Sequence, residues 1–235
     1  MLRKPLLLLT ILPLFLISCN DTPKKGTTTA TKTDKTKTDS LVAKPIEENK
    51  EEAFVLDEEN AIPFFFEYAK QNKERIVKIS TAFGSFTIKL FNETPYHRAN
   101  FIYLTKKGYY NDTYFHRVVK NFIIQGGNAD NKKTAQKRSE IGKYLLPPDT
   151  RKGFKHHRGT VSMPSSDIDN PHKLASPYEF FIVVKSPGSY HLDGSYTAFG
   201  RVIEGMDVVD KINQQPTDDG EWPMKNIPMK VEVIE

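Results

Sequence analysis

The chain has 235 residues, of which 38% are hydrophobic and 27% are charged. This length suits one well-packed domain with extensions and is too short for two large domains. The formal net charge of +5 provides no basic stripe that would neutralise a row of phosphates, so no nucleic acid partner is expected. A single cysteine excludes an internal disulfide and any metal site with several cysteine ligands.

The first 18 residues have the form of an export signal. Two basic residues precede an apolar run at positions 6–17, which is too short to span a bilayer. The run ends in the sequence LISC at residues 16–19, which resembles a bacterial lipoprotein signal. That resemblance implies removal of residues 1–18, lipidation of Cys19 and attachment to a membrane of the cell envelope. The alternatives are an uncleaved anchor or a plain secretory peptide with an incidental cysteine.

The next two segments lead to the predicted domain. Residues 19–53 are rich in Thr, Lys, Asp and Glu, and they lack the apolar content that would offset the entropy of ordering. We expect them to be a disordered linker. Residues 54–74 include a run of three phenylalanines after Pro63, which predicts a short helical lead-in whose aromatic face docks on the domain. A partly ordered segment fits the same residues equally well.

From Arg75 onward the pattern changes to short strands. Apolar and polar residues alternate at 75–80 and 85–91 around a tight turn at Phe83-Gly84, and a helix follows from Pro95 to about Lys106. The remaining segments predict a helix at 206–212 and strands at 114–118, 122–126, 160–163, 179–184, 198–203 and 229–234. Residues 75–235 are therefore expected to form a mainly β domain, a closed eight-stranded antiparallel barrel capped by two short helices.

One stretch of this domain carries the chemistry. Phe115-His116-Arg117 is followed by Phe122-Ile123 and then by Gln125-Gly126-Gly127. Taken alone, the arginine would be a strand-surface partner for a salt bridge, and the glycine pair would be a turn or bulge. Together these residues resemble the signature of the cyclophilins. Further matches to that family follow in the same order, at 86–91, 95–101, 159–163, 179–182, 192–194, 199–202 and 204–206.

The resemblance implies a peptidyl-prolyl cis/trans isomerase, for which proline-containing polypeptides are the substrates. Its chemical task is rotation about an amide bond, against a resonance barrier of roughly 18–20 kcal/mol. No covalent bond is made or broken, so no nucleophile, metal or cofactor is expected. Because a guanidinium is planar and always charged, Arg117 is suited to stabilise the twisted amide.

The resemblance also assigns roles to individual residues. Arg117, Phe122 and Gln125 take the catalytic roles, with Gln125 bonding the substrate backbone and helping to hold Arg117. Substrate contacts fall to Ile123, Phe181, Leu192, His191, Tyr196 and Pro164. The alternative for the apolar members is ordinary core packing.

Several positions depart from the family pattern. His191 stands where familiar eukaryotic members carry tryptophan, and Tyr196 stands where they carry histidine, which leaves cyclosporin-like inhibition open. Pro164 replaces a small residue, and Glu179 replaces a glutamine. The loop at 165–178 is longer than typical and is either a substrate-selecting element or a tolerated insertion. No role follows from the sequence of residues 129–154.

Three functions are consistent with these features. The first is an isomerase acting on X-Pro bonds of exported or envelope proteins, attached to the membrane through its N-terminal lipid. The second is a membrane-tethered module that binds proline-containing segments with little catalytic turnover. The third is a membrane-tethered scaffold for protein association. The sequence gives no sign of an oligomer.

Overall fold

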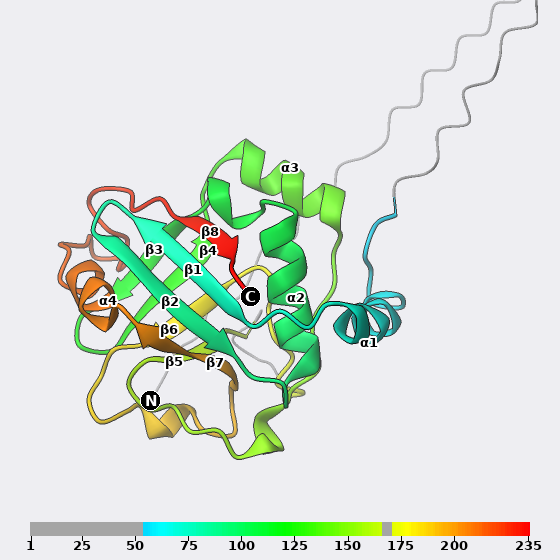
Figure 1. Ribbon diagram of the computed structural model, residues 1–235. Helices are drawn as coiled ribbons and strands as arrows, with labels where there is room; N and C mark the ends of the chain where they lie inside the picture. Colours follow the sequence, from blue (N-terminus) through cyan, green and yellow to red (C-terminus); the bar gives the residue numbers. More distant parts are fainter. Residues whose placement is uncertain (1–53, 166–170) are drawn as a thin grey trace, which may run out of the picture. The chain divides into compact units, whose positions relative to one another are not determined.

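The computed structural model describes residues 54–165 and 171–235 (Figure 1). The predicted signal peptide, Cys19 and the linker at 19–53 lie outside the described residues. The described residues all belong to one compact unit, Lys50–Glu235.

The described residues form one eight-stranded sheet in the order β3-β4-β6-β5-β7-β2-β1-β8. Every pair of neighbouring strands is antiparallel. The mainly β class and the eight antiparallel strands predicted from the sequence are therefore confirmed. The strands are β1 (Ile76–Thr81), β2 (Gly84–Leu90), β3 (Tyr114–Val119), β4 (Ile123–Asn128), β5 (Thr160–Met163), β6 (Phe180–Val183), β7 (Thr197–Glu204) and β8 (Lys230–Val233).

The sheet is an open half-barrel, so the prediction of a closed barrel is wrong. Its edge strands β3 and β8 meet only through an isolated bridge between Tyr114 and Pro228 and the backbone bonds on either side of it. The Phe115 N–H donates to the Ile227 carbonyl and the Met229 N–H donates to the Thr113 carbonyl, and no further pairing of β3 with β8 follows among the described residues. The four residues of β8 begin only after Pro228, and they pair with β1 instead.

Four α-helices accompany the sheet in the described part of the chain, where the sequence predicted two in the domain and a lead-in helix. They are α1 (Ala61–Gln71), α2 (Pro95–Lys106), α3 (Lys132–Ile141) and α4 (Met206–Asn213). Helix α3 was missed because it is almost entirely polar, with only Thr134 and Ile141 buried. It begins at Asn131, whose side chain accepts a hydrogen bond from the Thr134 N–H at 2.9 Å.

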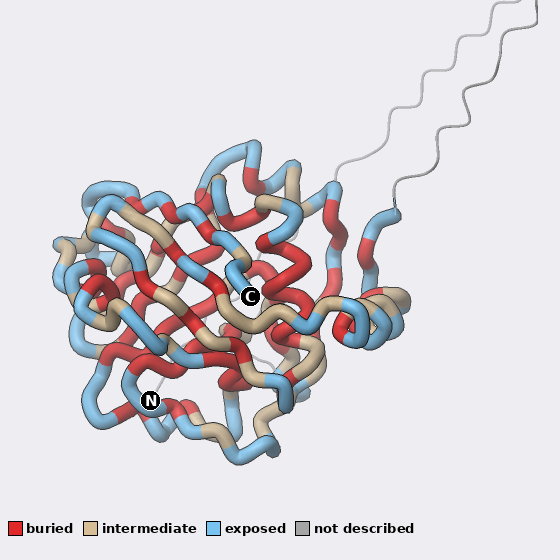
Figure 2. Tube along the Cα trace, in the orientation of Figure 1, coloured by how far each residue is buried: buried red, intermediate tan, exposed pale blue. Residues whose placement is uncertain are grey.

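The hydrophobic core lies between the concave face of the sheet and α2, where residues 97–105 are all buried (Figure 2). Large aromatic side chains fill it, and Phe101 contacts both Tyr110 and Phe180. Helix α1 joins this core through Phe65, which is fully buried and packs edge-on against Tyr103 with ring centroids 5.8 Å apart. The first helix is thus part of the folded unit.

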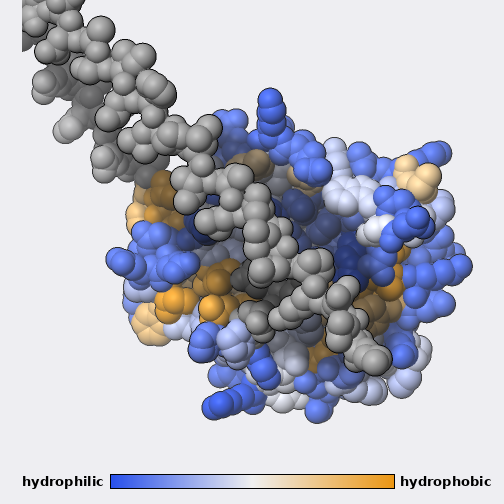
Figure 3. All heavy atoms as spheres, turned by 180° about the vertical axis from the view of Figure 1, so that it is seen from behind, coloured by the Kyte–Doolittle hydropathy of each residue, from blue (hydrophilic) through white to orange (hydrophobic). Residues whose placement is uncertain are grey.

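Seen from behind, the surface is mostly hydrophilic and carries separate hydrophobic patches (Figure 3). Exposed large hydrophobic residues near α1 include Phe54, Val55 and Phe66. Among the residues that the structure describes, no helix combines the length and the apolar character needed to cross a membrane.

Candidate active site

A row of side chains crosses four strands on the face of the sheet opposite the main core. Arg117 of β3 pairs in register with Gln125 of β4, Gln125 pairs with Phe181 of β6, and Phe181 pairs with Ser162 of β5. A bulge at His116 shifts the register just before this row. The strand pairing therefore places two of the predicted catalytic residues next to a predicted groove residue.

A second, smaller hydrophobic cluster lies beside this row and is separate from the main core. Cross-strand pairing explains it, because Ile123 lies opposite Val119 on one side and Val183 on the other. The cluster has four buried members, with three half-buried side chains packed on them. They are Ile123, Phe181, Val183 and Leu192, with Val119, Phe122 and Tyr196.

Aromatic contacts define the shape of this cluster. The Phe122 ring stacks on His191 with centroids 5.5 Å apart, and Tyr196 meets Phe181 edge-on at 5.7 Å. His191 is exposed, whereas Leu192 is buried. The structure thus brings five predicted substrate contacts and Phe122 together in one apolar cluster. Ile123, Phe181 and Leu192 are buried in it, as the core-packing alternative also expects, so their substrate contacts stay predictions.

Pro164 does not belong to this cluster. It follows β5 directly, is half-buried, and its carbonyl accepts a hydrogen bond from the Ser176 N–H at 2.8 Å. Its predicted substrate contact stays a prediction.

Arg117 is anchored by a residue that the sequence did not suggest. Its Nε donates a hydrogen bond to Oε2 of Glu221 at 2.6 Å, and both side chains are 40% exposed. Among the described residues, only Nε of the guanidinium has a hydrogen-bond partner within the protein. The outer nitrogens are therefore available to a ligand. No sequence signal pointed to Glu221, because it lies in an irregular loop 104 residues away.

Gln125 has a different partner from the one expected. Its Nε2 donates to Oε2 of Glu179 at 2.8 Å, so Glu221, and not Gln125, holds Arg117. Glu179 also lies 3.4 Å from His116 Nε2 and 3.4 Å from Arg138 of α3. Burial raises the pKa of the Glu179 carboxyl, but hydrogen bonds and charge from His116, Gln125 and Arg138 outweigh it and hold the pKa below its ordinary value.

A buried polar chain supports Phe181 from behind. The His156 ring lies parallel to Phe181 at 6.2 Å, and its Nδ1 and Nε2 contact Asp193 at 2.8 Å and Ser162 at 2.9 Å. No sequence signal pointed to His156, because it and Asp193 lie 37 positions apart in the chain. Burial lowers the pKa of His156 despite Asp193, which favours the neutral ring.

Hydrolases use a Ser, a His and an Asp in contact as a catalytic triad, and Ser162, His156 and Asp193 make the same contacts here. Their geometry does not permit nucleophilic attack by the serine. Ser162 is fully buried, so its Oγ cannot reach a substrate carbonyl. Within residues 54–165 and 171–235, no group of three or more His, Cys, Asp or Glu side chains is placed to hold a metal ion. The site consists of an anchored guanidinium beside an apolar surface.

The same architecture occurs in crystal structures of a cyclophilin-type peptidyl-prolyl cis-trans isomerase from Cryptosporidium parvum. One aligns with a TM-score of 0.58 and 28% sequence identity, and the match covers 69% of this chain and 98% of that one. The other, determined in the presence of the dipeptide Ala-Pro, aligns with a TM-score of 0.57 over 68% of this chain. Fold and site together define a protein of the cyclophilin class.

Sequence comparisons identify the family. Residues 76–233 match the family described as cyclophilin type peptidyl-prolyl cis-trans isomerase/CLD. The chain is 36% identical over 153 residues to peptidyl-prolyl cis-trans isomerase-like 1 of Neurospora crassa, a match covering 64% of this chain and 88% of that protein. It is 37% identical over 146 residues to a peptidyl-prolyl cis-trans isomerase of Acinetobacter baylyi, covering 60% of this chain and 73% of that protein.

A longer relative, peptidyl-prolyl cis-trans isomerase-like 2 of Rhizopus delemar, is 37% identical over 167 residues, and the match covers 70% of this chain but only 30% of that protein. The chain belongs to the cyclophilin-type peptidyl-prolyl cis-trans isomerase family. The enzyme class predicted from the signature around Arg117 is confirmed. The matched region leaves out α1 and everything before it.

Proposed function

We propose that the cluster around Phe122 and Phe181 binds the proline ring of a polypeptide, and that Arg117 stabilises its amide during rotation. The observation that carries this proposal is the apolar cluster beside a guanidinium whose outer nitrogens are available. An apolar surface next to a few directed polar groups is the usual composition of a ligand site. Leu192 and Ile123 would close the floor under the ring.

The chemistry follows from what rotation does to the amide. As the C–N bond twists, resonance is lost, the nitrogen becomes pyramidal and its lone pair becomes an acceptor. A donor that bonds the twisted amide more strongly than the planar one accelerates the rotation. Each tenfold gain in rate requires about 1.4 kcal/mol of such preference, so a few well-directed hydrogen bonds supply several orders of magnitude. Arg117 stays charged and donates throughout.

Titration of the full chain with a short Ala-Pro peptide, followed by NMR, tests the position of this site. We expect the largest shifts at Phe122, Phe181 and Tyr196, and cis/trans exchange peaks of the peptide when the protein is present in catalytic amounts. Shifts confined to other surfaces would contradict the proposed site. Shifts at these residues without exchange peaks would favour the proline-binding module with little turnover.

That second candidate has one observation in its favour. Glu179 engages the amide of Gln125 at 2.8 Å, so the amide that was expected to bond the substrate backbone already has an acceptor. A substrate would have to displace this contact or use the Gln125 carbonyl oxygen instead. Slow turnover would follow if the amide stayed bound to Glu179.

We also propose that the protein is a lipoprotein of a bacterial cell envelope and acts on exported or envelope proteins. The support is the LISC sequence at residues 16–19 after a short apolar run, followed by the polar linker to residue 53. Two or three acyl chains, each contributing about 0.8 kcal/mol per buried methylene, would hold it at a membrane. Labelling with palmitate in a bacterial host should mark the wild type and fail for Cys19→Ala. Equal labelling of both would contradict lipidation at Cys19.

A further inference from the structure

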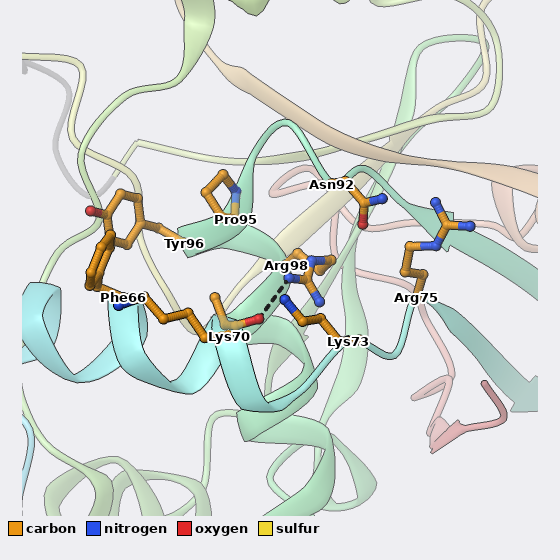
Figure 4. A pocket seen from close by; sticks show the side chains of 9 residues that line it. Phe66, Lys70, Lys73, Arg75, Asn92, Pro95, Tyr96 and Arg98 are labelled. Atoms are coloured by element: carbon orange, nitrogen blue, oxygen red, sulfur yellow. Dashed lines mark hydrogen bonds between the residues drawn. The ribbon is translucent and has the colours of Figure 1, made fainter.

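A cavity of about 530 Å³ lies between α1 and the start of α2, on residues that take no part in the candidate active site (Figure 4). Phe66 and Lys70 line it from α1, Lys73 and Arg75 from the segment that follows, and Tyr96 and Arg98 from α2. Helix α1 precedes the residues that match the family, so this cavity depends on an element outside the matched region.

The cavity is positively charged and has no carboxylate among its lining residues. In the described part of the chain, no Asp or Glu oxygen lies within 4.0 Å of the charged groups of Lys73 or Arg75. Lys70 is different, because its Nζ pairs with Glu67 at 2.7 Å. Lys73 and Arg75 are therefore cations of the cavity without an ion-pair partner among the described residues.

Arg98 adds a buried positive charge to this site. Its side chain is only 4% exposed, and its guanidinium donates to the carbonyls of Asn72 at 2.7 Å and Ala69 at 3.2 Å. Its Nε is buried without a partner, and burial lowers the pKa of the group. The nearest acid, Glu74, pairs with Lys106 at 2.5 Å and does not line the cavity. The Glu74 carboxylate raises the pKa of Arg98 by less than burial lowers it, so a further anion close to this buried charge would stabilise it.

The other end of the cavity is aromatic. Phe66 is 51% exposed, and Lys70 Nζ lies 3.9 Å from its ring centroid. Figure 4 shows Phe66 and Tyr96 together at one end of the cavity and Lys73, Arg75 and Asn92 at the other. A ligand that fits both ends carries negative charge next to an apolar or aromatic group.

We propose that this cavity binds an acidic segment of a polypeptide, with carboxylates against Lys73 and Arg75 and an aromatic side chain against Phe66 and Tyr96. A compact phosphate fits less well for two reasons. Pro95 at the start of α2 removes one N–H donor from that helix end, and carbonyls already occupy the Arg98 fork. The choice of a polypeptide rests on the proposed function, since such a site would hold a substrate polypeptide beside the isomerase and raise its effective concentration.

Fluorescence anisotropy of the full chain with a labelled, end-blocked peptide tests the proposal. The probe contains the sequence Glu-Glu-Phe-Glu-Glu and no proline. We expect saturable binding that weakens as salt is raised, because the cationic contacts are partly solvent-exposed. The double variant Lys73→Glu/Arg75→Glu should lose affinity at least tenfold, and Phe66→Ala should lose it about threefold. Lys132→Glu, at an exposed position on α3, is the matched control and should bind like the wild type.

Two controls keep the result interpretable. Circular dichroism should show that each variant melts as a folded protein, and the matched Gln-Gln-Phe-Gln-Gln peptide should bind at least tenfold more weakly than the acidic one. Equal binding of the two peptides, or unchanged binding by the double charge reversal, would overturn the proposal. So would binding of inorganic phosphate or of anionic vesicles at this site while the acidic peptide does not bind.

The same experiment separates this site from the isomerase. Because the probe lacks proline, Arg117→Ala should bind it normally. If the protein does not isomerise a proline peptide but still binds the acidic peptide, the result would contradict the proposed function alone. Normal isomerisation without binding of the acidic peptide would contradict this inference alone.

Discussion

The Nε atom of Arg117 donates a hydrogen bond to Oε2 of Glu221 at 2.6 Å, between residues 104 positions apart in the chain. This contact fixes the guanidinium through its inner nitrogen and leaves the outer nitrogens available to a ligand. Glu221 is itself placed by a turn in which its N–H bonds the Asp218 carbonyl at 3.1 Å, while Val118 of β3 donates to the Glu221 carbonyl at 2.8 Å. Loop and strand are therefore held together at the candidate site.

Glu221→Gln should lower kcat/KM for proline isomerisation by about two- to fivefold. Both side chains are 40% exposed, and pairs of this kind are worth roughly 0.2–1 kcal/mol, which sets the size of the effect. Gln retains an acceptor for Arg117 Nε, so the melting temperature should change little. An increase in kcat/KM would show that Glu221 restrains Arg117 instead of positioning it.

The carboxyl of Glu179 should make the free energy of unfolding depend on pH in the acidic range. Because His116, Gln125 and Arg138 hold its pKa below the ordinary value in the folded state, the unfolded chain binds a proton first as the pH falls. The stabilisation is present above roughly pH 4.3, the usual pKa of glutamate, and is lost as the pH drops through the lower folded-state pKa. Urea unfolding between pH 6 and pH 3 should show a steeper loss for the wild type than for Glu179→Gln. Parallel curves would contradict this assignment.

Phe65 and Phe66 are neighbours on α1 with opposite environments, and they offer a matched pair for testing the lead-in helix. Phe65 is fully buried, so Phe65→Ala should lower the free energy of unfolding by about 3–5 kcal/mol. Phe66 is 51% exposed, so Phe66→Ala should cost less than about 1 kcal/mol. Denaturant unfolding measures both. Similar small losses for the two variants would indicate that α1 contributes little to the stability of the domain.

Gly127 is required by close packing as well as by its backbone angle. A Cβ there would lie 2.2 Å from the Tyr178 carbonyl oxygen, and its φ is +100°. Gly153 has a φ of +82°, but nothing lies within 4 Å of a Cβ at that position. Gly127→Ala should therefore destabilise the protein by at least about 2 kcal/mol more than Gly153→Ala, whose cost is backbone strain alone. Equal costs would show that the Gly127 backbone moves away from Tyr178 without penalty.

The part of the site that the sequence could predict is the part that is local in sequence. The residues from Phe115 to Gly127 lie on two paired strands and the turn between them, so alternation sets which side chains share a face, except at the His116 bulge, which puts Phe115 in the core and Arg117 on the other face. Glu221 and the His156–Asp193 contact could not be predicted, because only the folded chain brings those positions together. Their residue types are common on protein surfaces and carry no spacing signal.

In the fold, too, the local features could be predicted from the sequence and the contacts between distant segments could not. The strand pattern predicted eight strands, since period-two alternation is visible in a single segment. Closure of the barrel depends on two edges that are far apart in the sequence, and at that seam only one isolated bridge, between Tyr114 and Pro228, joins them among the described residues. Helix α3 could not be predicted because it has almost no apolar face, and contacts such as that of Arg138 with Tyr109 at 2.8 Å hold it on the domain.

In the proposed function, the Arg117 guanidinium stabilises the twisted amide. The most direct test compares kcat/KM for isomerisation of a proline peptide by wild type, Arg117→Lys and Arg117→Ala. Removing a preorganised donor costs on the order of 10²–10³-fold in rate, so Arg117→Ala should fall by that factor, while Arg117→Lys should lie between the two. A folded Arg117→Ala variant that isomerises the peptide as fast as the wild type would contradict the claim.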